Sequence, residues 1–184
     1  MVEKLETERL LLLPSDPRLA EAVAGYFVRN RAFLRPFEPV HEEAFFSASG
    51  QRRFLRQEQR DMAAGNCIRF WAIRKKAVGI VMGSVALSGI VRGSFQSAYV
   101  SYRSDTAHLN RGYTTEALAR LVAFAFNNLV LHRLEANIMP RNKPSLRVVE
   151  KLGFVCEGLS HAYLNINGIW EDHLHMVKIN DKYV

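Results

Sequence analysis

The order of strand-like and helix-like patterns is the feature that most constrains how this chain folds. Strand patterns dominate the first half, a strand–helix–strand–helix segment follows, and two strands joined by Asn167-Gly168 close the sequence. This order predicts an α+β fold with a central mixed, mostly antiparallel sheet, splayed at its centre and flanked by helices. No repeat or flexible linker interrupts the pattern, so residues 1–184 are expected to form one domain.

The first half is expected to combine strands with two helices. The strands are predicted at 5–13, 68–74, 78–87 and 96–103, and the last three are expected to form an antiparallel meander. Asp16 and Pro17 begin the first helix. A charged second helix is predicted from 51 to about 64, and the proline-containing segment 33–46 between the helices is expected to be irregular or short-helical.

The second half is expected to alternate helices and strands. Its elements are predicted as a helix at 115–128, a strand at 133–138, a short helix beginning at 145, and strands at 163–166 and 169–179. Ser145 is expected to cap the short helix, which Gly153 ends.

The charge of the chain narrows the kinds of partner that it is expected to bind. A formal net charge of +7 and a pI near 9.7 create a field that attracts polyanions, such as a phosphate-rich cofactor, nucleic acid or a ribonucleoprotein. The predicted helix at 51–64 is a candidate contact for RNA or an acidic partner because it carries Arg52, Arg53, Arg56 and Arg60. A solvated basic surface without a dedicated partner is the alternative.

Composition argues against secretion, membrane insertion and a metal site. No apolar stretch approaches the roughly 18 residues of a membrane span, and the start of the chain carries acids. Cys67 and Cys156 lie in no paired motif, which suits a reducing cytoplasm. Asp172, His173 and His175 are better explained as ordinary strand residues than as metal ligands. A cytoplasmic protein without a metal is therefore expected.

A loop that opens a helix is the strongest candidate binding site. The segment Leu109-Asn110-Arg111-Gly112-Tyr113-Thr114-Thr115 lies between a predicted strand and a predicted helix. The first amides of a helix lack intrahelical partners and lie at the positive end of its dipole, so they bind phosphate groups. Gly112 lets the backbone approach the anion, and Arg111 adds a charge-assisted contact. An ordinary capped helix start is the alternative.

This loop and a series of other segments resemble the GNAT acetyltransferases. The resemblance is closest to the RimJ/RimL branch, whose members acetylate the N-termini of ribosomal proteins, and it covers nearly the whole chain. The matching segments are Thr7-Glu8-Arg9-Leu10, Phe33-Leu34-Arg35-Pro36-Phe37-Glu38-Pro39, Val91-Arg92-Gly93-Ser94-Phe95, Arg111-Gly112-Tyr113-Thr114-Thr115-Glu116-Ala117, His132-Arg133-Leu134-Glu135-Ala136-Asn137, Pro140-Arg141-Asn142-Lys143-Pro144-Ser145, Lys151-Leu152-Gly153-Phe154, Glu157-Gly158 and Asn167-Gly168-Ile169-Trp170-Glu171-Asp172-His173.

Two positions depart from the loop pattern of that family. Leu109 stands where Gln or Arg is usual, and Thr114 stands where Gly or Ala is usual. A leucine still offers its backbone amide, so the phosphate cradle is expected to survive with one side-chain contact fewer. The Thr114 methyl group is expected either to tighten the loop or to lower cofactor affinity modestly.

The resemblance implies a GNAT-like fold, acetyl-CoA as co-substrate and roles for particular residues. Acetyl transfer to an amine needs a neutral amine, a stabilised oxyanion and protonation of the departing thiolate. The strand ending Tyr102-Arg103-Ser104 is implied to polarise the thioester carbonyl through its backbone N–H groups. Ser145 is the candidate proton donor, with a helix cap as its alternative role. The other implied cofactor contacts are Leu109, Asn110, Arg111, Gly112, Tyr113, Thr114, Thr115, Asn137 and Asn142.

A general base is not evident from the sequence. Many family members carry a glutamate on the strand before the phosphate loop, where this chain has Ala98-Tyr99-Val100-Ser101. Candidates elsewhere are Glu38, Glu135 and His161. An α-amine has a pKa of about 7.7 to 8.0 and is neutral near pH 7 far more often than a lysine at about 10.4. The missing glutamate therefore favours an N-terminal amine as substrate, with water carrying its proton away.

Three functions stay open on the sequence alone. The first is a protein N-terminal acetyltransferase acting on ribosomal proteins or similar chains. The second keeps the chemistry but uses a small amine, an amino acid or an aminoglycoside as the acceptor. The third is a non-catalytic RNA-binding or ribosome-binding module. A monomer and a dimer are both compatible with each function.

Overall fold

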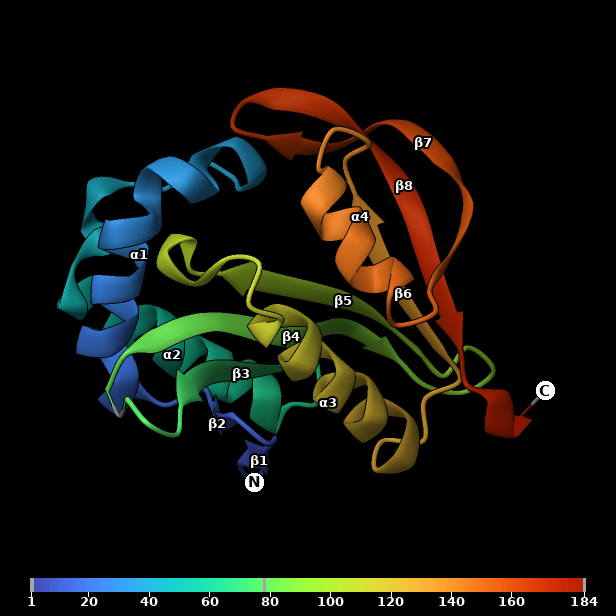
Figure 1. Ribbon diagram of the computed structural model, residues 1–184, viewed down its shortest axis with the longest axis horizontal. Coiled ribbons are helices and arrows are strands. Elements are labelled where there is room, and N and C mark those ends of the chain that lie inside the picture. The colour runs from blue at the N-terminus through green and yellow to red at the C-terminus, as the bar shows by residue number, and fades with distance from the viewer. Residues whose placement is uncertain (1, 78, 184) are drawn as a thin grey trace.

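An eight-stranded sheet organises the computed structural model, which describes residues 2–77 and 79–183 (Figure 1). The strand order is β1-β2-β3-β4-β5-β6-β8-β7, and neighbouring strands are antiparallel except for the pair β5 and β6. This confirms the predicted mixed, mostly antiparallel sheet. The strands are β1 (Leu5–Glu6), β2 (Leu10–Pro14), β3 (Cys67–Arg74), β4 (Val81–Val91), β5 (Ser97–Ser104), β6 (Arg133–Ile138), β7 (Val155–Ile166) and β8 (Ile169–Ile179).

Helices cover both faces of the sheet. The α-helices are α1 (Ala20–Leu34), α2 (Ala48–Ala63), α3 (Tyr113–Asn127) and α4 (Lys143–Glu150), and short 3-10 turns are η1 (Pro17–Leu19), η2 (Arg35–Phe37), η3 (Glu43–Phe46), η4 (Thr106–His108) and η5 (Asp181–Tyr183). Side-chain caps begin several of them. Asp16 accepts a hydrogen bond from the Arg18 amide before η1, and Ser47 accepts one from the Gly50 amide in α2.

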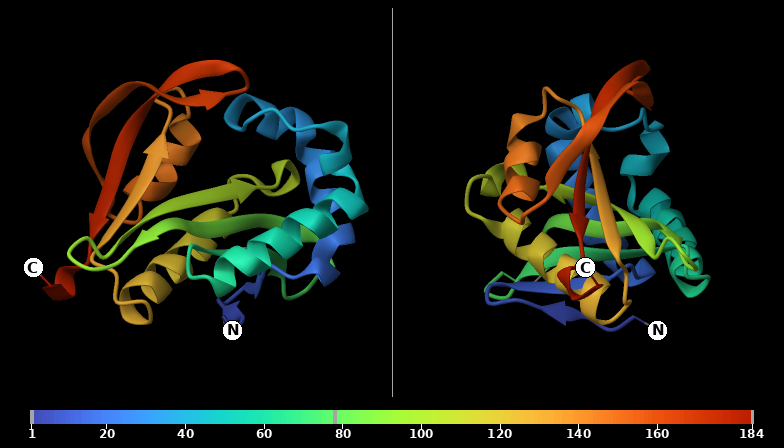
Figure 2. Two further views of the ribbon diagram at one scale, coloured as in Figure 1. Left: turned by 180° about the vertical axis from the view of Figure 1, so that it is seen from behind. Right: turned by 90° about the vertical axis from the view of Figure 1, so that its right-hand side faces the viewer.

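The two faces of the sheet contribute to two hydrophobic clusters. Trp71 and Ile73 on β3 pack with residues of α1 and α2, whereas Phe70 joins the cluster that contains α3 and α4. This division follows from the alternation of side chains along a strand. Figure 2 shows α1 and α2 on one side of the sheet and α3 and α4 on the other.

The two central strands separate part of the way along the sheet. β5 and β6 pair only from Ser97 to Tyr99 and from Arg133 to Glu135. Beyond these residues β5 continues to Ser104 and β6 continues to Ile138 in diverging directions, as Figure 1 shows. Diverging strands leave backbone N–H and C=O groups that a ligand can bind. The splayed centre predicted from the sequence is thus present.

Some predicted boundaries were wrong. The strand predicted at 5–13 is two strands, because the Thr7 amide donates to the Leu10 carbonyl at 3.0 Å and turns the chain. The last hairpin was expected to begin at 163, but β7 begins at Val155 and pairs with β8 on both sides of an irregularity. Val78, predicted to begin a strand, lies outside the described residues, and β4 runs from Val81 to Val91.

The helices themselves carry one further finding. None of those in the described part of the chain combines the length and the apolar character that crossing a membrane requires.

Candidate active site

A cavity of about 410 Å³ lies between the end of β5, the loop before α3 and the start of α4. Arg111 is exposed in the same loop, and Asn137 projects from β6 on the sheet face opposite the buried Ala136 and Ile138. The other predicted cofactor contacts and the predicted proton donor lie together in the cavity wall: Tyr102, Arg103, Ser104, Leu109, Asn110, Gly112, Tyr113, Thr114, Thr115, Asn142 and Ser145.

The loop before α3 is shaped by left-handed backbone at Asn110 and Gly112, whose φ angles are 58° and 76°. Asparagine and glycine are the residues that adopt this conformation most readily. Gly112 is the N-cap of α3, so the amides of the following residues open the helix beside the cavity. Such first-turn amides attract phosphate groups.

Arg9 and Glu116 anchor this loop to the turn between β1 and β2. Glu116 accepts hydrogen bonds from the Thr7 hydroxyl at 2.5 Å, the Arg9 amide at 2.9 Å and the Arg9 Nε at 2.5 Å. Arg9 also donates to the Arg111 carbonyl at 3.0 Å. Burial acts to raise the pKa of Glu116, but the hydrogen bonds from Thr7 and Arg9 outweigh it and lower that pKa below its usual value. The carboxylate is therefore held ionised behind the loop.

Thr114, a departure from the family pattern, forms a contact that glycine or alanine lacks. Its hydroxyl lies 2.6 Å from the hydroxyl of Ser104. This hydrogen bond joins the first turn of α3 to the end of β5. Leu109, the other departure, contributes a half-exposed side chain to the cavity wall.

Tyr102 and Ser145 meet between β5 and α4. The Tyr102 hydroxyl lies 2.6 Å from the Ser145 hydroxyl and donates to the Ser145 carbonyl at 2.9 Å. Burial raises the pKa of Tyr102 to about 12, against a smaller opposing effect of the Ser145 hydrogen bond. Tyr102 is therefore protonated at neutral pH.

The cap of α4 is Asn142, so the prediction that Ser145 caps this helix was wrong. The side-chain oxygen of Asn142 accepts a hydrogen bond from the Ser145 amide at 3.3 Å. Pro144 follows in the first turn, where its lack of an N–H costs nothing. Ser145 is among the residues that line the cavity.

Glu38 lies at a second cavity of about 290 Å³, formed by α1, the segment around η2 and η3, and Asn167 at the hairpin tip. Its carboxylate is buried, forms an ion pair with Arg103 and lies 3.4 Å from the Nε2 of His41. Arg103 lines the larger cavity, and Leu34 lines both cavities. The Glu38–Arg103 pair therefore stands where the two cavities adjoin.

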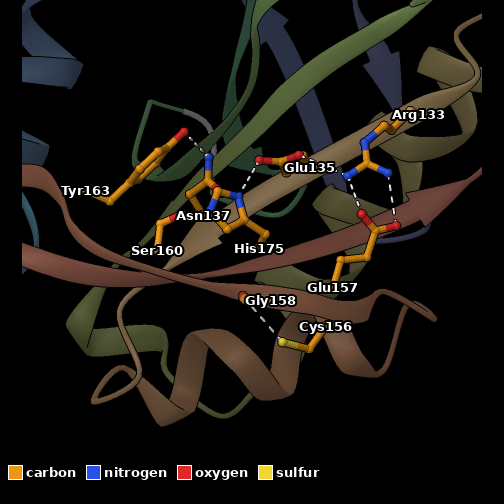
Figure 3. A network of polar contacts seen from close by, with 9 residues as sticks. All are labelled: Arg133, Glu135, Asn137, Cys156, Glu157, Gly158, Ser160, Tyr163 and His175. Atoms are coloured by element: carbon orange, nitrogen blue, oxygen red, sulfur yellow. Dashed lines mark hydrogen bonds and ion pairs between the residues drawn. The ribbon is translucent and has the colours of Figure 1, made fainter.

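The other two base candidates lie in separate polar clusters. Glu135 accepts from Arg133 at 3.2 Å, and its second oxygen lies 2.7 Å from the Nδ1 of His175 (Figure 3). His161 is exposed on β7 and lies 2.9 Å from Asp172. Neither is among the residues that line the larger cavity.

Arg141 is a residue that sequence reasoning missed. Its guanidinium donates to Glu171 at 2.6 Å and to the Pro36 carbonyl at 3.0 Å, and lies 5.7 Å from the ring centre of Phe37. It thus joins η2 to β8. The only signal for it was its position in the segment 140–145 that resembles the family.

A metal site is not formed by the part of the chain that the structure describes. No group of three or more His, Cys, Asp or Glu side chains there is arranged to hold a metal ion.

The diverging central strands and the helix-opening loop beside them define the class of this protein as an acetyltransferase. The chain belongs to the family described as Acetyltransferase (GNAT) domain, whose model matches residues 9–155. The predicted resemblance is confirmed, and the chain is an acetyl-CoA-dependent N-acetyltransferase. The non-catalytic module considered from the sequence is set aside by this membership.

Similar proteins extend over nearly the whole chain. A probable N-acetyltransferase of Bacillus subtilis, YjcK, is 35% identical over 96% of this chain and 97% of its own length. The [ribosomal protein uS5]-alanine N-acetyltransferase of Escherichia coli is 33% identical over 93% of this chain and 88% of its own. The crystal structure of ribosomal-protein-S5-alanine acetyltransferase from Vibrio fischeri matches with a TM-score of 0.91 at 34% identity, covering 98% of both chains.

Proposed function

We propose that this enzyme acetylates the N-terminal α-amine of a protein, with a ribosomal protein as the first candidate. The observation that carries the proposal is the similarity, over nearly the full length, to ribosomal-protein-alanine acetyltransferases of two bacteria. In this proposal the enzyme acts in the cytoplasm, where its substrate is made.

The diphosphate of acetyl-CoA would bind at the loop before α3. The amides of Tyr113, Thr114 and Thr115 open the helix there, and Arg111 is exposed in the same loop. Two left-handed residues bring the backbone close to the cavity without side-chain obstruction at Gly112. Anion binding by helix-opening amides needs no positive side chain, which is consistent with leucine at position 109.

The thioester would lie beside the free edge of β5, where backbone N–H groups stabilise the oxyanion. In the reaction the amine nitrogen forms a bond to the carbonyl carbon, the carbon–sulfur bond breaks, and the thiolate takes a proton. Ser145 is the proposed donor of that proton, because it carries a hydroxyl and lines the cavity. Tyr102 is protonated at neutral pH and 2.6 Å away, so it can replace the proton on Ser145 once its single hydrogen turns from the Ser145 carbonyl to the Ser145 hydroxyl.

The body of the acceptor would lie along the second cavity, which is on the same side of the sheet as Asn137 although Asn137 does not line it. That cavity adjoins the first at Leu34 and is walled by Arg35, Val40 and the hairpin tip. Glu38 is engaged with Arg103, so its charge serves to hold β5 and η2 together. This engagement favours a substrate that is already partly neutral near pH 7, which describes an α-amine better than a lysine side chain.

The test is mass spectrometry after incubation with acetyl-CoA and a panel of acceptors. The panel contains peptides with free N-termini, the same peptides with blocked N-termini and one internal lysine, and small primary amines including amino acids and an aminoglycoside. Acetylation of the free N-termini alone is expected. Gly112→Asp places a carboxylate at the diphosphate site and provides the inactive control. Products only from small amines would replace the proposed acceptor with a small molecule.

Contact with ribosomal RNA is a second part of the proposal. Arg52, Arg53, Arg56 and Arg60 are all exposed on α2, and the chain carries a net charge of +7. Phosphate contacts by such a helix would make binding fall steeply with salt. Binding of the purified protein to ribosomes at two salt concentrations, with and without replacement of the four arginines by glutamine, tests this contact.

A further inference from the structure

The face of the sheet opposite α3 and α4 carries a cluster of polar side chains where β5 and β6 separate. Tyr99 and Glu135 are the last residues that pair the two strands. Asn137 is the next residue of β6 on that face, since the alternating Leu134, Ala136 and Ile138 are buried on the other. Asn137, drawn in Figure 3, therefore stands at the opening between the strands. It is on the side of the sheet away from the proposed cofactor cavity.

The side chain of Asn137 has one unused hydrogen-bonding atom. Its Nδ2 lies 3.5 Å from the hydroxyl of Tyr163, but its Oδ1 is buried and has no hydrogen-bond partner among the described residues. A buried acceptor without a partner is costly and therefore uncommon in folded proteins. An N–H group of a ligand in the opening would satisfy it.

An irregular turn of β7 brings Tyr163 to this position. Between the pairs Ser160–His173 and Leu164–Glu171, β7 has three residues where β8 has only Asp172. Asp172 holds this bulge, because its two oxygens contact the Ala162 amide at 2.8 Å and the His161 Nδ1 at 2.9 Å. Such bulges re-aim side chains and occur often beside active sites.

Strained backbone also indicates that the bulge holds Tyr163 in a fixed position. Ala162, in the centre of the bulge, has a φ of 47°, a left-handed conformation that is strained for a residue with a Cβ atom. The ring of Tyr163 crosses β8, with its centre 5.0 Å from that of His175. His175 is fixed beneath it, because its ring nitrogens lie 2.7 Å from Glu135 and 2.7 Å from Ser160. The chain thus keeps Tyr163 in one place at a conformational cost.

Charged and titratable groups surround this cluster. Glu135, Arg133 and Glu157 form a paired chain on β6 and β7 (Figure 3). Tyr99 of β5 pairs with Glu135 at the point where the two strands separate. Burial, followed by the neighbouring Tyr99 and Glu135, raises the pKa of Tyr163 above its usual value. Tyr163 is therefore a neutral phenol at neutral pH, and its hydroxyl accepts from Asn137 with Tyr99 as a second polar neighbour.

We propose that the Asn137 Oδ1 and the Tyr163 hydroxyl form a binding seat for the acceptor amine, and that this seat selects primary amines. The inference rests on the proposed acetyl transfer and concerns the opposite side of the strand opening from the cofactor. One N–H of the amine donates to Oδ1, which turns the nitrogen lone pair toward the gap between β5 and β6. An uncharged oxygen accepts this hydrogen from the neutral, reactive amine without favouring its protonated form.

The selection follows from a count of hydrogens. A primary amine that attacks the thioester releases one proton and keeps one N–H, which stays on Oδ1 as the amide forms. A secondary amine has only one hydrogen on its nitrogen. It must therefore lose its hydrogen bond to the Asn137 Oδ1 when that hydrogen leaves as a proton. The unaltered enzyme is therefore expected to prefer a primary amine over its N-methyl counterpart.

The test compares Asn137→Ala, Asn137→Asp and Tyr163→Phe with the unaltered enzyme. Asn137→Ala is expected to raise the KM for the acceptor about tenfold, the loss of about one hydrogen bond. The dissociation constant of CoA, measured by calorimetry, should stay within about twofold. Asn137→Asp keeps an acceptor oxygen and should retain more of the acceptor affinity. Asn128→Ala, at the exposed end of α3, is the matched control.

The preference for primary amines provides a readout that a structural role would not change. The ratio of kcat/KM for a peptide and for its N-methylated form should fall toward one in Asn137→Ala. An unchanged acceptor KM together with weaker CoA binding would overturn this proposal. It would instead identify Asn137 as a contact for the cofactor, as the sequence predicted.

The acceptor for these assays is whichever primary amine the unaltered enzyme acetylates. If that amine is a small molecule and no peptide reacts, the protein substrate is wrong while the seat is still tested. If acetyl-CoA binds but no amine on the panel is acetylated, both proposals fail.

Discussion

The hydroxyl of Tyr102 lies 2.6 Å from the hydroxyl of Ser145, although the two residues are 43 positions apart. β5 supplies the tyrosine and the first turn of α4 supplies the serine, so the pair exists only because α4 packs beside the end of β5. The hydrogen bond connects a protonated phenol to the residue proposed to protonate the thiolate.

Removal of this pair should slow the chemical step. Ser145→Ala is expected to lower kcat by about 10- to 100-fold, the range of a general acid, with a smaller change in the affinity for CoA. Tyr102→Phe should lower kcat less, because water can replace its proton. Stopped-flow measurement of thiol release checks both values. Ser49→Ala, at an exposed position of α2 that lines neither cavity, should behave as the unaltered enzyme does.

The pH profile gives a second check on the same pair. Since burial raises the pKa of Tyr102 to about 12, this residue stays protonated throughout the range from pH 6 to pH 10. Any change in kcat within that range should keep its midpoint in Tyr102→Phe. A midpoint that disappears in this variant would mean that Tyr102 titrates in the working range.

Glu116 is expected to stabilise both the fold and the phosphate loop. Glu116→Gln should lower the free energy of unfolding by about 2 kcal/mol, since the charged acceptor of three hydrogen bonds is lost. The affinity for CoA should fall with it, because Arg9 no longer holds the Arg111 carbonyl in place. Chemical denaturation and calorimetry measure the two effects. Glu8→Gln, an exposed neighbour, is the control.

The same carboxylate predicts a direction for acid sensitivity. The folded-state pKa of Glu116 is lowered, so its stabilising contribution is fully present above the unfolded value of about 4.3 and is lost as the pH falls through the lowered value. Glu116→Gln should therefore show a shallower loss of stability below pH 4 than the unaltered protein. A difference in the free energy of unfolding between the two proteins that stays constant as the pH falls would contradict this.

Glu38 is predicted to act in stability rather than in proton transfer. Glu38→Gln leaves the largely buried Arg103 without its counter-charge and should cost about 3 kcal/mol. The pH dependence of kcat in the remaining folded enzyme should be unchanged. A variant of normal stability with kcat lowered a hundredfold would instead identify Glu38 as the general base.

Gly83 should tolerate no side chain. A Cβ atom there would lie 2.1 Å from the Arg103 carbonyl, and its φ of 149° adds further strain. Gly83→Ala is therefore expected to displace the end of β5, lower the melting temperature and weaken CoA binding. Gly25→Ala is the matched substitution, because Gly25 is exposed on α1 and a Cβ atom there would meet nothing within 4 Å. It should stabilise the protein by about 0.5 to 1 kcal/mol.

Sequence reasoning located the loop before α3 and most helices because these depend on neighbouring residues. Gly112 before an amphipathic helix and the alternation at 133–138 are local signals, and α3 and β6 form there. The cap of α4 was assigned to Ser145 because serine is a common cap, whereas Asn142, three residues earlier, performs this role. The start of β7 was missed because its exposed residues show no alternation that marks a strand.

The amino-acid sequence by itself determined the family, the order of the elements and the loop that opens α3, because periodicity, glycine positions and ordered family segments all lie along the chain. Only the tertiary structure decided which side chains meet. It placed Tyr102 against Ser145, Arg103 against Glu38, and the Tyr163 hydroxyl beside the Nδ2 of Asn137. These contacts depend on the divergence of β5 and β6, the packing of α4 and the bulge in β7, which set distances between segments that no local pattern encodes.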